Sequence, residues 1–150
     1  MDLLLIAESH ADNAYAGTTG AEVVPFENNS IEGSNSVLER DWNRYMEDVA
    51  RANILICNID AVTDNSLTTA ERAQYKAEAK IFRAMIMFDM VRLWGDFPVI
   101  TTVAEDITSD NIEDVYPQYF PEQNTELEAY QQIERDLLDA VQYAPDNTPG

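Results

Sequence analysis

The sequence predicts an all-α protein, because apolar residues recur with a helical period in three long segments and each segment begins with a helix-capping motif. In that motif, Ser or Thr is followed three residues later by Glu, so that the hydroxyl and the carboxylate accept hydrogen bonds from backbone amides at the helix start. The motifs place three helix starts at Ser36, Thr68 and Thr125. The polar segments 12–35 and 103–124 are then expected to be long loops.

The first predicted helix begins at Ser36 and runs to about residue 59. Its apolar residues recur at alternating spacings of four and three, which places them on one helix face that should be buried against a neighbour. Cys57, the only cysteine of the chain, lies beside this stripe and is expected to be a small core residue rather than a nucleophile. The stripe consists of Leu38, Trp42, Tyr45, Val49, Ala52, Ile56 and Ile59.

The second predicted helix runs from Thr69 to Trp94 and has two apolar faces. Two such faces indicate burial on both sides, as in the inner helix of a stack. Ala84, Phe88 and Pro98 also match part of the tetratricopeptide pattern, in which pairs of helices pack as hairpins. One face carries Ala73, Ala77, Ile81, Ala84, Phe88 and Val91, and the other carries Ala79, Phe82, Ile86, Met90 and Leu93.

The third predicted helix runs from Thr125 to about Tyr143. Its apolar stripe is narrower than those of the other two helices, which indicates a position further outside in the fold. The stripe contains Leu127, Tyr130, Leu137 and Val141, with either Ile133 or Glu134 between them.

The chain of 150 residues is long enough for one domain with its own core. Its 28 acidic residues against 9 Lys and Arg give a formal charge of −19, so repulsion from phosphates argues against nucleic acid as a partner. The apolar run from Leu3 to Ala7 is too short for a membrane span or a signal-peptide core. We therefore expect either a cytoplasmic protein or a chain that starts after its targeting segment.

Catalytic groups are sparse in this sequence. His10 is the only histidine and has no recognisable Ser or Cys nucleophile motif to pair with. Carboxylate pairs suited to glycoside hydrolysis arise by chance in so acidic a chain. The acidic residues of segment 103–124 lack the glycine that an EF-hand calcium loop needs for its turn, so we expect a solvated loop there. We expect no enzyme activity, no metal and no cofactor.

Aromatic residues in the two loops have two interpretations. Loop aromatics commonly fix a loop to its domain, but they also stack on the apolar C–H faces of sugar rings while amide and carboxylate groups bind the hydroxyls. The run Asp12-Asn13-Ala14-Tyr15 offers both kinds of group. The other loop aromatics are Phe26, Tyr116, Tyr119 and Phe120.

Three segments occur in a recognisable order: WNRYMEDVARANILICNID (42–60), AEAKIFRAMIMFDMVRLWGDFPVIT (77–101) and AYQQIERDLLDAVQYAPD (129–146). They resemble the N-terminal part of the SusD/RagB family. The first resembles its W-x-x-x-Y-x-x-I-x-x-A-N signature through Trp42, Val49 and Ala52-Asn53, but has Met46 at the tyrosine position, directly after Tyr45. The second resembles its R-A-x-x-x-F-x-x-x-R-x-x-G-D-x-P core, here Arg83-Ala84, Phe88, Arg92, Gly95-Asp96 and Pro98.

The resemblance implies a SusD-like α-α superhelix of tetratricopeptide-like helix pairs, in which Arg83 and Arg92 pair with acidic neighbours. It also implies a non-catalytic component of an outer-membrane uptake system, which binds an oligosaccharide or another nutrient and delivers it to a SusC-like TonB-dependent transporter. Under this interpretation the expected ligand contacts are Asp12, Asn13 and Tyr15, followed by Asn28 and Asn35.

Members of that family are larger, with a lipidated cysteine upstream and further helix pairs downstream. We therefore expect residues 1–150 to be a single N-terminal helical portion of a SusD-like domain, a fragment of a larger surface-exposed lipoprotein whose lipid anchor is absent from this chain. The alternative is a tetratricopeptide-like protein-interaction module, whose acidic surface would select a basic partner with salt-sensitive binding. A hydrolase is a third interpretation, but no feature of the sequence requires it.

Overall fold

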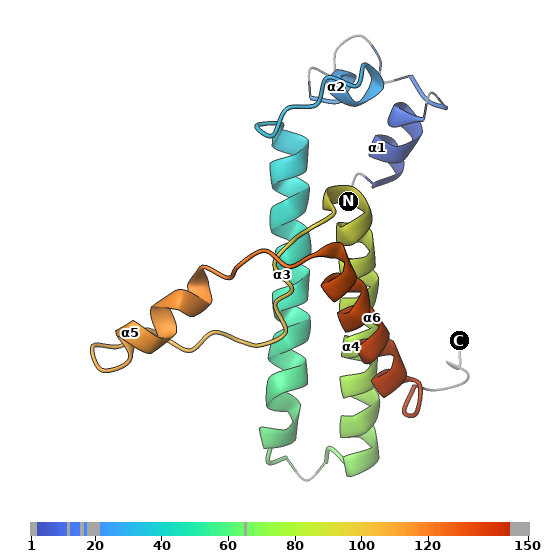
Figure 1. The fold of residues 1–150 in the computed structure, drawn as a ribbon. Coiled ribbons are helices and arrows are strands. Elements are labelled where there is room, and N and C mark those ends of the chain that lie inside the picture. The colour runs from blue at the N-terminus through green and yellow to red at the C-terminus, as the bar shows by residue number, and fades with distance from the viewer. Residues whose placement is uncertain (1–2, 12, 16, 18–21, 65, 145–150) are drawn as a thin grey trace. The chain divides into compact units, whose positions relative to one another are not determined.

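The computed structural model describes residues 3–11, 13–15, 17, 22–64 and 66–144, and it confirms the all-α class (Figure 1). The only extended pairing among these residues is an antiparallel bridge between Phe97 and Asn124. The chain divides into two compact units, Met1–Met46 and Glu47–Gly150, which are described separately. The elements are α1 (Leu3–His10), α2 (Val24–Glu27), α3 (Ser36–Asn58), η1 (Ile59–Ala61), α4 (Thr69–Trp94), α5 (Ile112–Val115), η2 (Tyr116–Tyr119) and α6 (Glu126–Ala140).

The first unit contains α1, α2 and the N-terminal half of α3. The sequence predicted neither α1 nor α2, since one is a short apolar run and the other is a single turn within the polar segment 12–35. Pro25 lies in the first turn of α2, where its missing amide hydrogen costs no helical hydrogen bond. The two helices contact each other, and Ile6 and Phe26 are buried.

The start of α3 differs from the predicted capping motif. The side-chain oxygen of Asn35, not that of Ser36, accepts hydrogen bonds from the backbone amides of Val37 (2.9 Å) and Leu38 (3.4 Å). Ser36 is therefore the first helical residue, and Asn35 is the cap. The predicted apolar stripe is confirmed further along the helix, where Tyr45, Val49, Ala52, Ile56 and Ile59 are buried.

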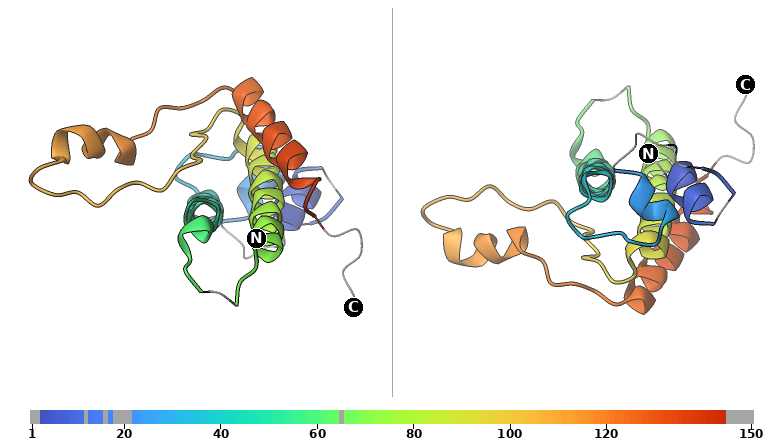
Figure 2. Two further views of the ribbon diagram at one scale, coloured as in Figure 1. Left: turned by 90° about the horizontal axis from the view of Figure 1, so that it is seen from below. Right: turned by 90° about the horizontal axis from the view of Figure 1, so that it is seen from above.

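The second unit is built around α4, which begins and ends at the predicted residues. The C-terminal half of α3 runs antiparallel to α4, and α6 lies along α4 in all three views of the ribbon (Figures 1 and 2). Both α4 and α6 open with the predicted capping boxes, at Thr68 with Glu71 and at Thr125 with Glu128. These local motifs fix the helix starts because they satisfy amides that have no partner within the helix.

The face of α6 that packs inside this unit shares only Ile133 with the predicted stripe. The buried residues of α6 are Ala129, Ile133, Asp136 and Ala140, whereas Leu127, Tyr130, Leu137 and Val141 are exposed. Two alanines, one isoleucine and one carboxylate therefore make the packed face, and the other large apolar side chains are left on the outside. The helix also ends at Ala140 rather than near Tyr143, and the next residues form a turn whose amides bond to the carbonyl of Ala140.

Cys57 is exposed on α3, so the prediction that it is a core residue was wrong. Its neighbour Ile56 is buried in a cluster with Ala52, also on α3, and Ala79 of α4. One residue along a helix is a rotation of about 100°, which is enough to carry Cys57 out of the core.

The capping box of α6 predicts a specific pH dependence of stability. The backbone amide and then the hydroxyl of Thr125 hold the pKa of Glu128 below its ordinary value. A lowered native pKa gives stability that is present above the unfolded pKa and is lost as the pH falls through the native pKa. Glu128→Gln is therefore expected to lower the free energy of unfolding at pH 7 and to flatten its decline below about pH 5.

This dependence is measured by urea unfolding followed by circular dichroism at several pH values. The matched control is Glu134→Gln, which removes an equal charge from an exposed position in the middle of α6. An acid-induced decline that is equally steep in Glu128→Gln and in the wild type would contradict the prediction.

Candidate functional site

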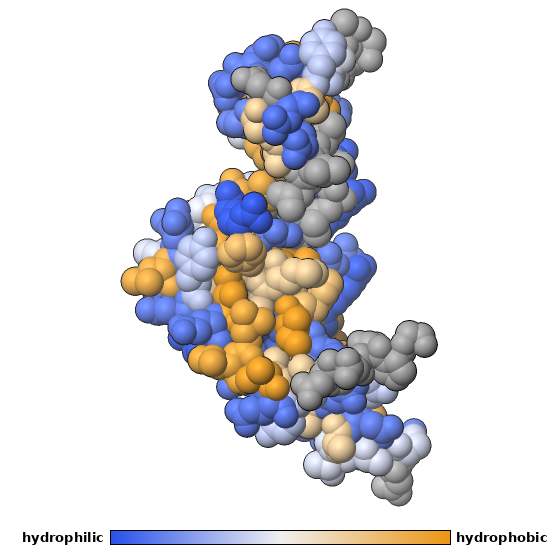
Figure 3. Space-filling model, turned by 90° about the vertical axis from the view of Figure 1, so that its right-hand side faces the viewer, coloured by the Kyte–Doolittle hydropathy of each residue, from blue (hydrophilic) through white to orange (hydrophobic). Residues whose placement is uncertain are grey.

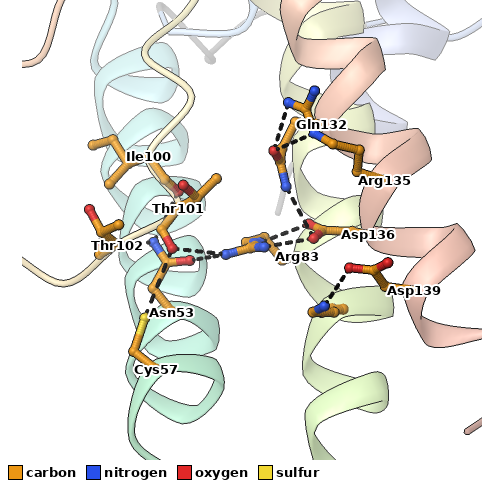
Figure 4. A network of polar contacts seen from close by, with 11 residues as sticks. Asn53, Cys57, Arg83, Ile100, Thr101, Thr102, Gln132, Arg135, Asp136 and Asp139 are labelled. Carbon is orange, nitrogen blue, oxygen red and sulfur yellow. Dashed lines mark hydrogen bonds and ion pairs between the residues drawn. The ribbon is translucent and has the colours of Figure 1, made fainter.

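A buried polar network joins the three long helices in the second unit (Figure 4). The guanidinium of Arg83 on α4 donates to both carboxylate oxygens of Asp136 on α6, at 2.8 and 2.6 Å. It also donates to the side-chain oxygen of Asn53 on α3, at 2.6 Å. All three residues are buried. Because a buried charge is tolerated only when it is paired and hydrogen-bonded, this geometry fixes how α3, α4 and α6 meet.

The same network holds the extended chain that follows α4. The amide of Asn53 donates to the carbonyls of Ile100 (3.0 Å) and Thr102 (3.4 Å), and Arg83 donates to that of Thr101 (3.3 Å). Asn53 ends the first family-like motif and Arg83 begins the second, so the two motifs meet in space. The predicted pairing of Arg83 and Arg92 with acidic neighbours is confirmed, since Arg92 lies 3.6 Å from Asp89.

Sequence reasoning did not identify Asn53 and Asp136 as the partners of Arg83. One signal was available for Asp136, because it stands three residues after Ile133 and four before Ala140. A carboxylate at that spacing lies on the same helix face as the two apolar residues. An acidic residue on a buried face requires a cation, and Arg83 is the cation that this fold supplies.

The Gly-Asp-x-Pro part of the second motif connects α4 to α6. Gly95 has φ +70°, and a Cβ there would lie 3.2 Å from the Glu126 carboxylate, so both backbone and space favour glycine. The side chain of Asp96 accepts a hydrogen bond from the backbone amide of Glu126 at 2.8 Å, in the first turn of α6. Asn124 bridges to Phe97 and accepts from the amide of Val99 at 2.9 Å. This motif is therefore structural, as the sequence predicted.

The five predicted ligand contacts all belong to the first unit. Asp12 lies outside the described residues. Asn13 and Asn28 are exposed, and Tyr15 is the most exposed of the large hydrophobic side chains described, at 72%. Asn35 is half-buried, and its side chain caps α3 and donates to the carbonyl of Glu22 at 2.9 Å. Their role in ligand binding stays a prediction.

An apolar groove of about 1040 Å³ lies between α4 and α6. The wall from α6 consists mainly of larger side chains that the internal packing leaves exposed, together with the buried Ile133. It faces Ile81, Met85 and Phe88 of α4. Figure 3 shows these apolar side chains gathered on one face of the molecule. A groove of this size on a helical hairpin is suited to a further apolar helix face. The wall contributed by α6 includes Leu127, Tyr130, Ile133, Leu137, Leu138 and Val141.

A smaller hollow of about 370 Å³ holds both lysines of the chain. Lys76 lies 2.6 Å from Asp60, and Lys80 lies 2.7 Å from Asp139 on α6. Hydrogen bonding to each ammonium group, followed by its charge, lowers the pKa of the paired carboxyl. Arg72, the third cation of the lining, donates to the carbonyls of Ile59 and Asp64. Because the lysines are paired with carboxylates and the arginine with carbonyls, the cations of this hollow hold elements of the unit together.

Two kinds of site are absent from the part of the chain that the structure describes. No group of three or more His, Cys, Asp or Glu residues there is placed to hold a metal ion. No helix among those residues is long and apolar enough to cross a membrane.

Solved structures share this fold. A SusD-like protein from Bacteroides fragilis superimposes with a TM-score of 0.80 at 23% sequence identity, over 100% of this chain and 28% of the other. A laminarin-binding SusD-like protein superimposes with a TM-score of 0.78 at 24% identity, over 97% of this chain and 30% of the other. The fold is therefore the all-α, tetratricopeptide-like arrangement of SusD-like proteins.

Sequence comparison gives the same relationship. A SusD-like protein from Bacteroides ovatus is 29% identical over 142 residues, which are 95% of this chain and 23% of that protein. The chain thus spans less than a third of the length of these relatives. The family described as "Starch-binding associating with outer membrane" matches residues 5–149. With nearly every residue covered by that match, and with the two motifs meeting at Arg83, the chain belongs to the SusD-like family.

Proposed function

We propose that this chain is the N-terminal helical portion of a larger, non-catalytic glycan-binding protein of an outer-membrane uptake system. The observation that carries the proposal is the match of residues 5–149 to a family described as starch-binding and associated with the outer membrane. The fold shared with a laminarin-binding protein agrees with it. The whole protein would be a surface-exposed lipoprotein that delivers oligosaccharides to a SusC-like TonB-dependent transporter.

The proposed ligand contacts are Asp12, Asn13 and Tyr15, with Asn28 and Asn35 as secondary candidates. The exposure of Tyr15 supports this choice, because a phenol ring open to solvent offers a face on which a sugar can stack. Asn13 follows α1 closely and is exposed, so its side-chain amide can form hydrogen bonds with sugar hydroxyls. Asn35 is the weakest candidate, since capping already occupies its side-chain oxygen.

The apolar groove between α4 and α6 supports the proposal that the chain is a portion of a larger domain. Further helices of a longer SusD-like chain would cover the groove and bury its exposed leucines. The same groove favours a second candidate function, a tetratricopeptide-like module that binds another protein. A basic partner drawn to this acidic chain would be released by salt, whereas stacking on sugar rings is far less sensitive to ionic strength.

Affinity of the purified chain for soluble, uncharged polysaccharides tests the proposal. We expect binding that persists at high salt and that weakens about tenfold in Tyr15→Ala, roughly the loss of one aromatic contact. Tyr143→Ala is the matched control, because Tyr143 is another exposed tyrosine and lies in the second unit. Unchanged affinity in Tyr15→Ala would remove that residue from the site. Salt-sensitive binding of a basic protein, with no binding of polysaccharide by the folded chain, would favour the protein-interaction module.

A further inference from the structure

The segment between α4 and α6 forms a projecting loop, here defined as residues 103–123. Figures 1 and 2 show its two helical turns, α5 and η2, held away from the long helices. The bridge between Phe97 and Asn124 closes its base. The loop contains no Lys or Arg.

The projecting loop is held together by its own hydrogen bonds. Asn111 accepts from the backbone amide of Thr108 at 2.7 Å and donates to the carbonyl of Asp106 at 3.1 Å. The hydroxyl of Tyr119 donates to the carbonyl of Glu105 at 2.9 Å, which ties the two limbs of the loop together. A loop that is ordered before it meets a ligand loses less conformational entropy on binding.

Three aromatic side chains, the loop cluster Tyr116, Tyr119 and Phe120, are exposed on this scaffold. The rings of Tyr116 and Phe120 contact each other with centroids 4.9 Å apart and planes inclined at 45°. They remain 53% and 64% exposed, respectively. The buried apolar residue of the loop is instead Val115. These two rings therefore do not serve to fix the loop to the helices, which was the ordinary interpretation of loop aromatics.

The charge around the loop cluster restricts what it can bind. Segment 103–124 carries six carboxylates and no basic residue, so an anionic ligand would be repelled at close range. An uncharged glycan meets no such repulsion, because its C–H faces stack on the rings and its hydroxyls donate to carboxylates and backbone carbonyls. The carboxylates are Glu105, Asp106, Asp110, Glu113, Asp114 and Glu122.

We propose that the loop cluster Tyr116, Tyr119 and Phe120 is a second glycan-binding surface, specific for uncharged saccharides and made of residues other than those of segment 12–35. This inference rests on the proposed glycan-binding function and adds to it a site and a ligand class. Tyr116 and Phe120 provide the stacking faces. Tyr119 acts as a positioning residue, since its hydroxyl is engaged in holding the loop.

Isothermal titration calorimetry of the 150-residue chain with laminarin and with soluble starch, both uncharged glucans, tests this proposal. In a Tyr15→Ala background, in which the first proposed site is weakened, the double substitution Tyr116→Ala/Phe120→Ala is expected to weaken binding at least about tenfold further, with an unchanged thermal midpoint. The matched control Tyr75→Ala, an exposed tyrosine on α4, should bind as the wild type does. Polygalacturonate, a polyanion, should not bind.

A second variant tests whether weaker binding could come from a change in the structure of the loop. Phe120→Trp keeps an aromatic face and should retain affinity while adding a fluorescence signal that changes with laminarin. Equal affinity of Tyr15→Ala with and without the double substitution would overturn the second site and leave the proposed function standing. Absence of binding by the wild type to either glucan would overturn both. Tighter binding to polygalacturonate than to laminarin would overturn the ligand class assigned here.

Discussion

Arg83→Met is expected to lower the free energy of unfolding by about 3–5 kcal/mol, the usual cost of removing one partner from a buried ion pair. The substitution leaves the carboxylate of Asp136 buried without its cation and takes a donor from Asn53. Since domains are stable by only about 5–15 kcal/mol, a large fraction of the stability should be lost and the urea midpoint should fall. Urea unfolding followed by circular dichroism at 222 nm, a general reporter of helix, measures the effect.

The control uses the partner residue. Adding Asp136→Leu to Arg83→Met replaces the buried pair with apolar side chains, so the double variant should be more stable than Arg83→Met alone. Arg51→Met is the surface control, because Arg51 pairs only with exposed or half-exposed carboxylates on its own helix and should cost less than about 1 kcal/mol. A small effect of Arg83→Met, equal to that of Arg51→Met, would contradict the view that this network fixes the helices.

The helix starts at Thr68 and Thr125 could be predicted because a capping box is a local pattern of a few residues. Gly95 likewise marked the end of α4. At α3 the local pattern was ambiguous, since Asn35 and Ser36 are both good caps, and the asparagine forms the cap. Single-turn elements such as α5 escaped prediction, because four residues are too few for a periodic pattern.

The packed face of α6 could not be predicted from hydrophobicity. Alternation of apolar residues identified the side with Leu127, Leu137 and Val141, yet α6 meets α4 through alanines and the pair of Arg83 with Asp136. A pattern of apolar residues indicates that a face needs burial but does not say which partner buries it. In this family member the apolar face of α6 lines an open groove, and a polar interaction makes the contact inside the chain.

The candidate site was predictable only as a region. Long loops are common places for function, and both segments named from the sequence carry exposed aromatic side chains. The different roles of the aromatic side chains in the second loop could not be predicted, because nothing in the sequence distinguishes Tyr116, Tyr119 and Phe120 from one another. Only the folded structure distinguishes the ring whose hydroxyl donates to the carbonyl of Glu105 from the two rings that contact each other.

Phe97→Ala is expected to cost about 3–5 kcal/mol, as for other fully buried phenylalanines. The ring is 1% exposed, and its backbone carbonyl accepts from the amide of Asn124 at 3.1 Å, so Phe97 anchors the base of the projecting loop. Phe120→Ala is the matched control within that loop. It removes the same atoms from a ring that is 64% exposed and should change stability by less than about 0.5 kcal/mol.

The two substitutions therefore distinguish a residue that stabilises the base of the projecting loop from a residue that contacts the ligand. In thermal and urea unfolding, Phe97→Ala should be far less stable than the wild type, and Phe120→Ala should be about as stable as the wild type. Affinity for glucan should nevertheless fall in Phe120→Ala. A stability loss in Phe120→Ala as large as that in Phe97→Ala would mean that its ring supports the fold and is not free to stack on a sugar. Because both substitutions remove the same atoms, we expect the burial of each ring to be the main source of a difference in stability between them.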